Sequence, residues 1–287
     1  MKKILSLALV LVLCLAMFAG CGSSSAVSED GTISGSINVI SREDGSGTRG
    51  AFTEITGIDD GDGDRTIASA QFISSTQTVI TTVAGDSYAI GYISLASLSD
   101  SVKALQVAGV DATVENVLNG SYTIARPFNI ALGVDACEAA EYFVEYIFSA
   151  EGQAIVEEEG GISTGNTGAY TNIPDLSGET ITISGSTSVF PIMEVLTETY
   201  AEMTGCKFEL SGGGSSTGMK DAMAGTVDIG MASRELKDTE TAVVEGLAIA
   251  MDGIAVIANS SNPIDSLTME QIMNIYIGEV TDWSELN

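Results

Sequence analysis

The feature that most constrains the fold is a pattern of strand, Gly/Ser/Thr-rich turn and helix that recurs along the chain. The first such turn is SREDGSGTRG at residues 41–50, between an apolar run at 37–40 and a segment of helical character at 51–55. A second turn surrounds Thr187 and a third surrounds Ser215. Alternation of strands and helices predicts an α/β fold with mainly parallel strand pairing.

Each of these turns is suited to holding an anion. A helix N-terminus leaves backbone N–H groups free and carries the positive end of the helix dipole. Hydroxyls add donors, and Arg42 adds a forked, charged one. Because ligands of open α/β sheets bind at the carboxyl ends of strands, the three turns with Arg42 predict donors that converge on one small oxyanion. For any single turn, an ordinary strand-to-helix connection is the alternative.

The N-terminus has the pattern of an export signal at residues 1–20, in which two lysines precede an apolar run too short for a membrane span. Small residues then lead to Cys21, as in a bacterial lipoprotein signal, where cleavage leaves the cysteine as a lipidated N-terminus. This resemblance implies an anchor on the extracytoplasmic face of the cell membrane. Residues 21–34 are small and polar and are predicted to be a flexible tether.

The composition argues against several classes of function. The net charge is −28, from 39 acidic and 11 basic residues, which disfavours nucleic acid as a partner. An anion still fits, because charges beyond about 8 Å are largely screened at physiological salt. The absence of histidine removes Ser-His-Asp and Cys-His catalysis and argues against zinc. Beyond the signal and Cys21, only Cys137 and Cys206 remain, which make no disulfide framework. No metal or cofactor is expected.

Two further motifs resemble known sites only in part. Residues 214–218 match G-x-S-x-G around Ser216, but there is no histidine base, and Lys220 is expected to point into solvent. Residues 59–64 (DDGDGD) resemble the start of a calcium loop, but Gln71 stands where the closing glutamate belongs. A solvated surface loop is the preferred interpretation there.

Apolar spacing predicts one amphipathic helix at 138–159, ended by two glycines. Residues 122–134 are predicted to be extended, since Pro127 disfavours a helix. Residues 163–179 are loop-like and form the best interior linker, while 248–258 is apolar enough for a buried strand.

Several distinct motifs, spread over nearly all of the chain beyond the signal, resemble those of one family. They are SREDGSGTRGAF, SGSTSVFP, SGGGSSTGMK, VDIGMASRELK, AIAMDGIAVIANSSNP and IYIGEVTDW. This set is similar to that of the phosphate-binding proteins of ABC phosphate importers. The resemblance implies a two-lobed type II periplasmic-binding-protein fold with a ligand cleft between the lobes. It also implies a monomer without enzymatic activity, which captures inorganic phosphate and delivers it to the membrane subunits of an ABC permease.

The order of the motifs differs from that of the family, where the segment like SGSTSVFP stands near the N-terminus and the one like SREDGSGTR follows TDWSEL. Joining Asn287 to about Gly35 would restore the family order, so the chain is interpreted as a natural circular permutant. The linker at 163–179 would then join the old ends. A fragment of a tandem duplication is the alternative, which is disfavoured because each motif occurs once.

The permutation predicts the composition of the lobes. One lobe would be continuous, residues 123–258, and carry the Thr187 and Ser215 loops. The other would be discontinuous, residues 35–122 plus 259–287, and carry the Arg42 loop. The hinge is expected where the chain crosses between them.

The resemblance also implies roles for individual residues. Asp44 would orient Arg42 by pairing with it. In the family, an aspartate at the position of Ser233 accepts the proton of phosphate and thereby rejects sulfate, so Ser233 leaves the basis of selectivity open. The expected ligand-binding residues are Thr187, Ser188, Ser215, Ser233, Arg42, Ser46, Gly47 and Thr48.

Three alternatives remain open at this point. The ligand is another oxyanion, such as sulfate, molybdate or a phosphonate. The protein is a serine-based phosphatase or esterase, although the lack of histidine argues against this. Or it is a surface lipoprotein or sensor partner whose permuted lobes no longer close.

Overall fold

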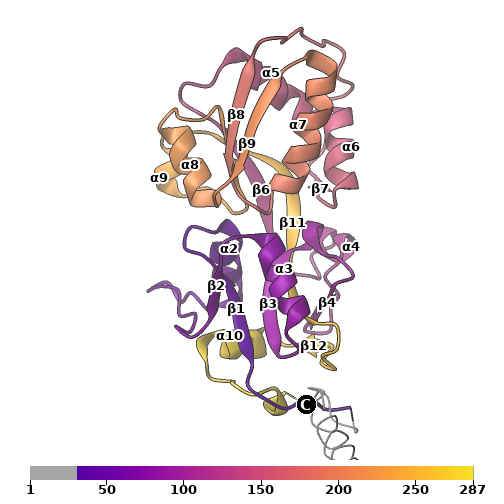
Figure 1. Ribbon diagram of the computed structural model, residues 1–287, viewed down its shortest axis with the longest axis vertical. Coiled ribbons are helices and arrows are strands. Elements are labelled where there is room, and N and C mark those ends of the chain that lie inside the picture. Colours follow the sequence, from indigo (N-terminus) through magenta and orange to yellow (C-terminus); the bar gives the residue numbers. More distant parts are fainter. Residues whose placement is uncertain (1–30, 287) are drawn as a thin grey trace, which may run out of the picture.

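The computed structural model describes residues 31–286, which form two α/β lobes stacked along the long axis of the molecule (Figure 1). This agrees with the predicted two-lobed fold. The predicted signal at 1–20, Cys21 and most of the tether at 21–34 lie outside the described residues. The lower and upper lobes are named here from their positions in Figure 1.

The lower lobe combines segments from both ends of the described chain. Its elements are β1 (Asn38–Arg42), α2 (Gly47–Thr56), β2 (Gln71–Ile73), α3 (Thr76–Gly85), β3 (Ala89–Ser94), η1 (Leu95–Ser97), β4 (Val102–Ala104), β5 (Gln106–Val107), α4 (Val114–Leu118), β12 (Ser266–Leu267), α10 (Met269–Ile277) and η2 (Trp283–Glu285).

The upper lobe is built from the middle of the chain. Its elements are β6 (Ala125–Leu132), α5 (Glu138–Ile147), α6 (Ala150–Glu158), β7 (Ile162–Ser163), β8 (Thr180–Gly185), α7 (Phe190–Thr204), β9 (Lys207–Gly212), α8 (Ser215–Met223), β10 (Ile229–Ala232), α9 (Asp238–Thr241) and the first half of β11 (Gly246–Asn259).

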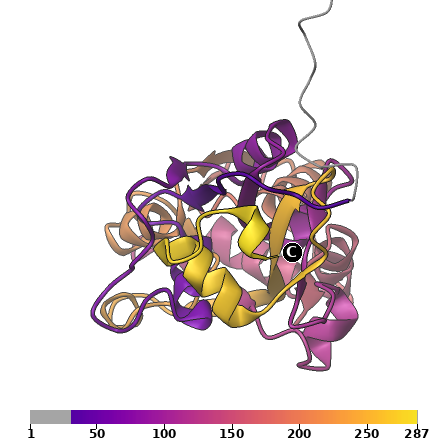
Figure 2. The same ribbon diagram turned by 90° about the horizontal axis from the view of Figure 1, so that it is seen from below.

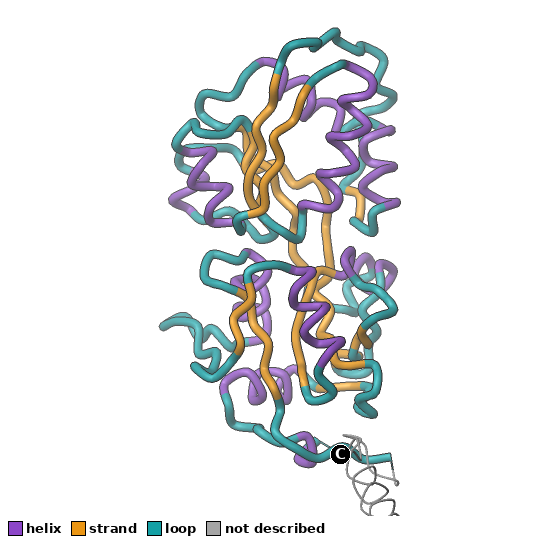
Figure 3. The backbone as a smooth tube through the Cα atoms, in the orientation of Figure 1, coloured by secondary structure: helices purple, strands orange, loops and turns teal. Residues whose placement is uncertain are grey.

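A single sheet runs through both lobes in the order β2-β1-β3-β11-β6-β10-β8-β9. Strands that precede the Gly/Ser/Thr turns pair in parallel, as β1 does with β2 and β3, and β8 with β9 and β10. The prediction of mainly parallel pairing is wrong at the centre, where β11 is antiparallel to β3 and β6. The reason is that β6 carries the chain into the upper lobe and β11 carries it back (Figure 3).

The lobe boundary within β11 lies earlier than predicted. Residues 246–253 pair with β6, whereas 254–258 pair with β3 and belong to the hydrophobic core of the lower lobe. The predicted boundary after residue 258 is therefore displaced by about half a strand. The sequence of β11 is apolar on both sides of the point where the strand passes between lobes, so the apolar pattern does not reveal where one lobe ends and the other begins. On β6, the core changes between Ile124 and Phe128, close to the predicted boundary.

The predicted single helix at 138–159 is wrong, because α5 and α6 are separate helices. Ser149 caps α6, its Oγ accepting from Gly152 N at 3.1 Å. A Cβ on Gly152 would collide with the backbone carbonyls of Tyr146 and Ile147, so the chain turns tightly here. The apolar spacing of the two helices is continuous, which hides this break. The predicted linker at 163–179 contains no helix or strand after Ser163.

The two ends of the described chain meet at the bottom of the lower lobe. Ile37 N donates to Thr281 O at 2.8 Å, and Trp283 N donates to Gly35 O at 3.0 Å. Figure 2, which looks onto this end of the molecule, shows the C-terminal segment there. This adjacency is what a circular permutation requires, and the permutation itself stays a prediction.

The lower core is organised around Phe52, which is fully buried and stacks on Tyr92 with ring centroids 3.9 Å apart. We expect Phe52→Ala to lower the free energy of unfolding by about 3–5 kcal/mol, because it leaves a cavity in a close-packed core. Phe72→Ala is the matched control, since Phe72 is 44% exposed and contacts Arg49 through its ring face. Its loss should cost below about 1 kcal/mol. Urea unfolding of both variants measures the difference, and equal losses would contradict this description of the core.

Candidate functional site

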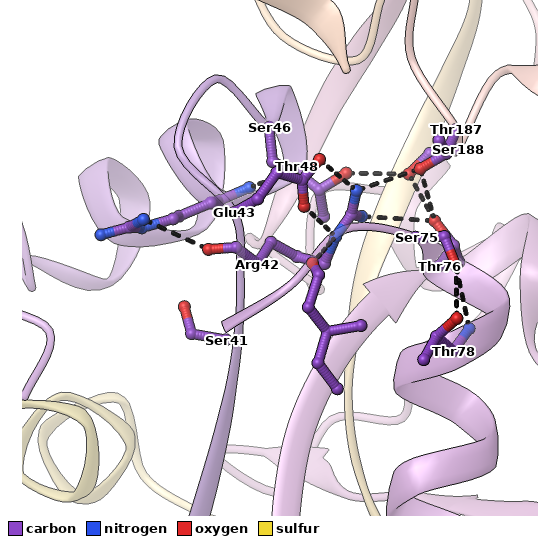
Figure 4. A network of polar contacts seen from close by, with 12 residues as sticks. Ser41, Arg42, Glu43, Ser46, Thr48, Ser75, Thr76, Thr78, Thr187 and Ser188 are labelled. Carbon is purple, nitrogen blue, oxygen red and sulfur yellow. Dashed lines mark hydrogen bonds and ion pairs between the residues drawn. The ribbon is translucent and has the colours of Figure 1, made fainter. Parts of the chain in front are cut away.

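The three turns predicted to bind an anion meet between the two lobes. The turn at 41–50 comes from the lower lobe, and the loops with Thr187 and Ser215 come from the upper lobe. Figure 4 shows Arg42 and Thr48 beside Thr76, Thr187 and Ser188. Both lobes thus contribute to one cluster of hydroxyl groups around a guanidinium, called here the hydroxyl cluster. It is centred on Arg42, Thr48, Thr76, Thr187 and Ser188.

The N-terminus of α2 places Thr48 in this cluster. Ser46 is the N-cap, and its Oγ accepts from Arg49 N at 3.3 Å, which satisfies one of the free donors of the helix. The hydroxyl of Thr48 crosses to the upper lobe, with Oγ1 2.9 Å from Ser188 Oγ and 3.3 Å from Ser233 Oγ. Thr48 is fully buried. The first turn of α2 is thus part of the boundary between the lobes.

Arg42 ends β1 and spans the same boundary. Its guanidinium donates from Nη2 to Thr187 Oγ1 at 3.0 Å and from Nη1 to Thr76 Oγ1 at 3.3 Å. Nε also donates to Ile73 O at 3.1 Å. The residue is 2% exposed, so its charge is removed from bulk water.

The predicted pairing of Asp44 with Arg42 is wrong. Arg42 pairs with Glu43, Nε to Oε2 at 2.9 Å and Nη2 to Oε1 at 3.0 Å. Asp44 occupies the exposed turn between β1 and α2, where its carboxylate binds Arg49 Nη1 at 2.6 Å. Its side chain is 99% exposed.

The upper lobe adds a group of buried serines from three loops. Ser233 N donates to Ser215 Oγ at 3.0 Å, and Ser186 Oγ donates to Ser233 Oγ at 2.8 Å. Ser215 begins α8 and Ser233 follows β10. Contacts therefore join Arg42, Thr48, Thr187, Ser188, Ser215 and Ser233, six of the eight residues predicted from the motifs. Gly47 approaches Ser215, whereas the hydroxyl of Ser46 is used to cap α2. Their binding of an anion stays a prediction.

Sequence reasoning missed four members of this neighbourhood: Thr76, Ser186, Arg126 and Asp252. Thr76 is the first residue of α3. Arg126 Nη2 donates to Thr48 Oγ1 at 3.0 Å, and its Nη1 pairs with Asp252 Oδ2. The signal that would have found the pair is Asp252 itself, a single charge inside the apolar segment GLAIAMDGIAVIAN.

Both members of this pair are buried. Burial raises the pKa of the Asp252 carboxyl and lowers the pKa of the Arg126 guanidinium, because it disfavours the charged form of each. Their attraction to each other opposes both shifts. Asp252 Oδ1 also accepts from Ala96 N at 3.1 Å, which stabilises the charged form of the carboxyl group.

Pockets open at the boundary between the lobes next to the cluster. One of about 390 Å³ is lined by Thr76, Thr187 and Phe190, among others. Another of about 780 Å³ is lined by residues that include Arg126 and Arg234. Both draw their walls from the two lobes, so small solutes have access to the region of the cluster.

The two motifs that resembled known sites only in part have other contacts in the structure. Ser216, at the centre of the G-x-S-x-G match, lies 3.4 Å from Arg234 Nη2, while Lys220 is exposed. In the calcium-like loop, Asp64 pairs with Arg49 and Asp60 with Arg65. Among residues 31–286, no group of His, Cys, Asp or Glu is arranged to hold a metal ion. None of the helices described is long and apolar enough to cross a membrane.

Comparison with known proteins agrees with the resemblance seen in the motifs. The model of the PBP superfamily domain matches residues 26–151 and 164–287. The phosphate-binding protein PstS 2 of Streptococcus agalactiae is 43% identical over 280 residues, covering 94% of this chain and 93% of the relative. PstS 2 of Streptococcus pneumoniae is 42% identical over 291 residues, covering 99% of both chains.

A solved structure supports the same assignment. The crystal structure of a phosphate-binding protein of a phosphate ABC transporter from Streptococcus pneumoniae matches with a TM-score of 0.70 and 42% identity. The match covers 88% of this chain and 100% of that one. The chain therefore belongs to the PBP superfamily, within the family of the phosphate-binding proteins PstS.

Proposed function

We propose that this protein captures inorganic phosphate between its lobes and delivers it to an ABC phosphate importer, without chemical change. The observation that carries the proposal is that a buried arginine and hydroxyls from both lobes converge at one place. Its relatives of similar length are named phosphate-binding proteins, which supports the same ligand.

The cluster suits an oxyanion because nearly every group in it donates hydrogen bonds. Arg42 supplies charge, and the free N–H groups at the starts of α2 and α8 add to it. Because the donors come from both lobes, the anion would hold the lobes together. The residues proposed to bind it are Arg42, Ser46, Gly47, Thr48, Thr187, Ser188, Ser215 and Ser233.

Selectivity over sulfate needs an acceptor for the proton that phosphate retains at neutral pH. Ser233 Oγ already accepts from Ser186, which leaves its own hydrogen to donate. Glu43 lies beside the cluster, but both of its oxygens accept from Arg42. This arrangement keeps a related oxyanion such as sulfate, molybdate or a phosphonate as the second candidate ligand.

The remaining parts of the proposal concern location and partners. We place the protein on the extracytoplasmic face of the cell membrane, held there through a lipidated Cys21, as a monomer that meets the membrane subunits of a permease. The circular permutation belongs to the same proposal and is supported by the meeting of residues 35–37 with 281–283.

Titration calorimetry with phosphate and with sulfate tests the ligand. We expect heat with phosphate. Sulfate binding weaker by about tenfold or more would show that the site holds an acceptor for the proton of phosphate, since an unpaired buried polar group costs about 1–3 kcal/mol. Equal affinities would remove the claim of selectivity and favour a general oxyanion site. Absence of heat with either anion would contradict the proposed function.

Arg42→Ala should weaken phosphate binding by about 2–5 kcal/mol, because it removes a buried charged partner of the anion. Arg65→Gln is the control for loss of one positive charge, as the side chain of Arg65 is 42% exposed and pairs with Asp60. Calorimetry on both variants measures the effect. Near-normal affinity of the Arg42 variant would remove Arg42 from the site.

Gly47 allows the lobes to approach each other. A Cβ at Gly47 would collide with Ser215 Oγ and lie 3.0 Å from Ser233 Oγ, both in the upper lobe. Gly47→Ala should therefore weaken phosphate binding by more than about tenfold, or about 1.4 kcal/mol. Gly50→Ala is a matched control in the same helix, where the nearest atom is Arg234 Cδ at 3.9 Å. Small-angle scattering with phosphate should show compaction for the control, and compaction of both variants would contradict this role for Gly47.

A further inference from the structure

A second buried arginine contacts the hydroxyl cluster from the crossing strands. Arg126 and Asp252 are register partners in the antiparallel pairing of β6 with β11, at the place where the chain passes between lobes. Their side chains are 2% and 0% exposed. Arg126 is bound to Thr48 as well as to Asp252. The ion pair therefore connects the crossing strands with the first turn of α2.

The contact with Thr48 fixes the direction of hydrogen bonding in the cluster. An arginine can only donate, so Thr48 Oγ1 must accept from Arg126 Nη2. The single hydrogen of the threonine is then left to point toward Ser188, Ser233 or an anion between them. Arg42 acts in the same way on Thr76 and Thr187. The two arginines thus turn three threonine hydroxyls into donors.

Arg126 also has one N–H group that its contacts with Asp252 and Thr48 do not use. Arg126 Nε is buried and has no hydrogen-bond partner among the described residues. Apolar side chains can replace a buried ion pair whose only role is packing. Such a role would not explain why the guanidinium of Arg126 is held against the hydroxyl of Thr48. The extra donor and the Thr48 contact both favour a role toward a ligand.

We infer that Arg126 is a second arginine of the phosphate site, which positions Thr48 as a donor to the anion. Asp252 holds Arg126 in place. This inference rests on the proposed function and extends it, since it assigns a binding role to a residue outside the motifs. It predicts that ligand affinity depends on Arg126 even when the buried ion pair is removed as a unit.

The test is calorimetry with phosphate on the purified protein and on the double variant Arg126→Met/Asp252→Asn. The double variant leaves no unpaired buried charge, and the amide oxygen of the substituted side chain can still accept from Ala96 N, so the fold should be kept. We expect its phosphate affinity to fall by about tenfold or more. Affinity within about twofold of the unchanged protein would overturn the inference. No phosphate binding by the unchanged protein would overturn the proposed function, and the inference with it.

Arg126→Lys provides a second route should the double variant not fold, which thermal unfolding detects. Lysine keeps the charge and can pair with Asp252, but it lacks the fork that reaches two partners, so affinity should still fall by about tenfold. Unchanged affinity of this variant would overturn the inference.

A double-mutant cycle with Thr48→Val separates the positioning of Thr48 by Arg126 from a general loss of stability. If Arg126 acts through Thr48, the double change should cost less affinity in the Thr48→Val background than in the unchanged protein. Equal costs in both backgrounds would contradict an action through Thr48.

Discussion

The arrangement of both lobes depends on the antiparallel pairing of β6 with β11. These strands cross between the lobes side by side, and each is buried along most of its length. Because one strand carries the chain up and the other carries it back, every loop of the upper lobe is placed relative to the lower lobe by this pair. The contacts of Thr48 with Ser188 and of Arg42 with Thr187 follow from that placement.

The buried positive charges of this acidic chain are paired with carboxylates. The buried arginines Arg42, Arg126 and Arg234 are each matched by one carboxylate, Glu43, Asp252 and Glu240 respectively. A buried ion of either sign is costly without a partner, so each pair is close to neutral as a unit. The affinity proposed for the cluster toward an anion would then depend on local donors, with little influence of the acidic surface on groups so deeply buried.

The local pattern of the sequence was sufficient to find the turns that meet between the lobes. Thr187, Ser215 and the Arg42 loop each follow a strand and open a helix, and such turns are recognisable one at a time. Contacts between distant strands were not recognisable in this way. Arg126 and Asp252 are separated by more than a hundred residues, and only their register in the sheet brings them together. The choice of Glu43 over Asp44 likewise depends on which way a turn directs two adjacent carboxylates, which their order alone does not reveal.

The meeting of the chain ends at the bottom of the lower lobe has a consequence for motion. Residues 35–37 lie against 281–283 at the pole farthest from the upper lobe. With attachment to a membrane through Cys21, as proposed, the predicted flexible tether would join the anchor to the lower lobe, and the upper lobe would be connected to it only through the crossing strands β6 and β11. Opening and closing would then swing residues 125–253 relative to the lobe that carries Arg42.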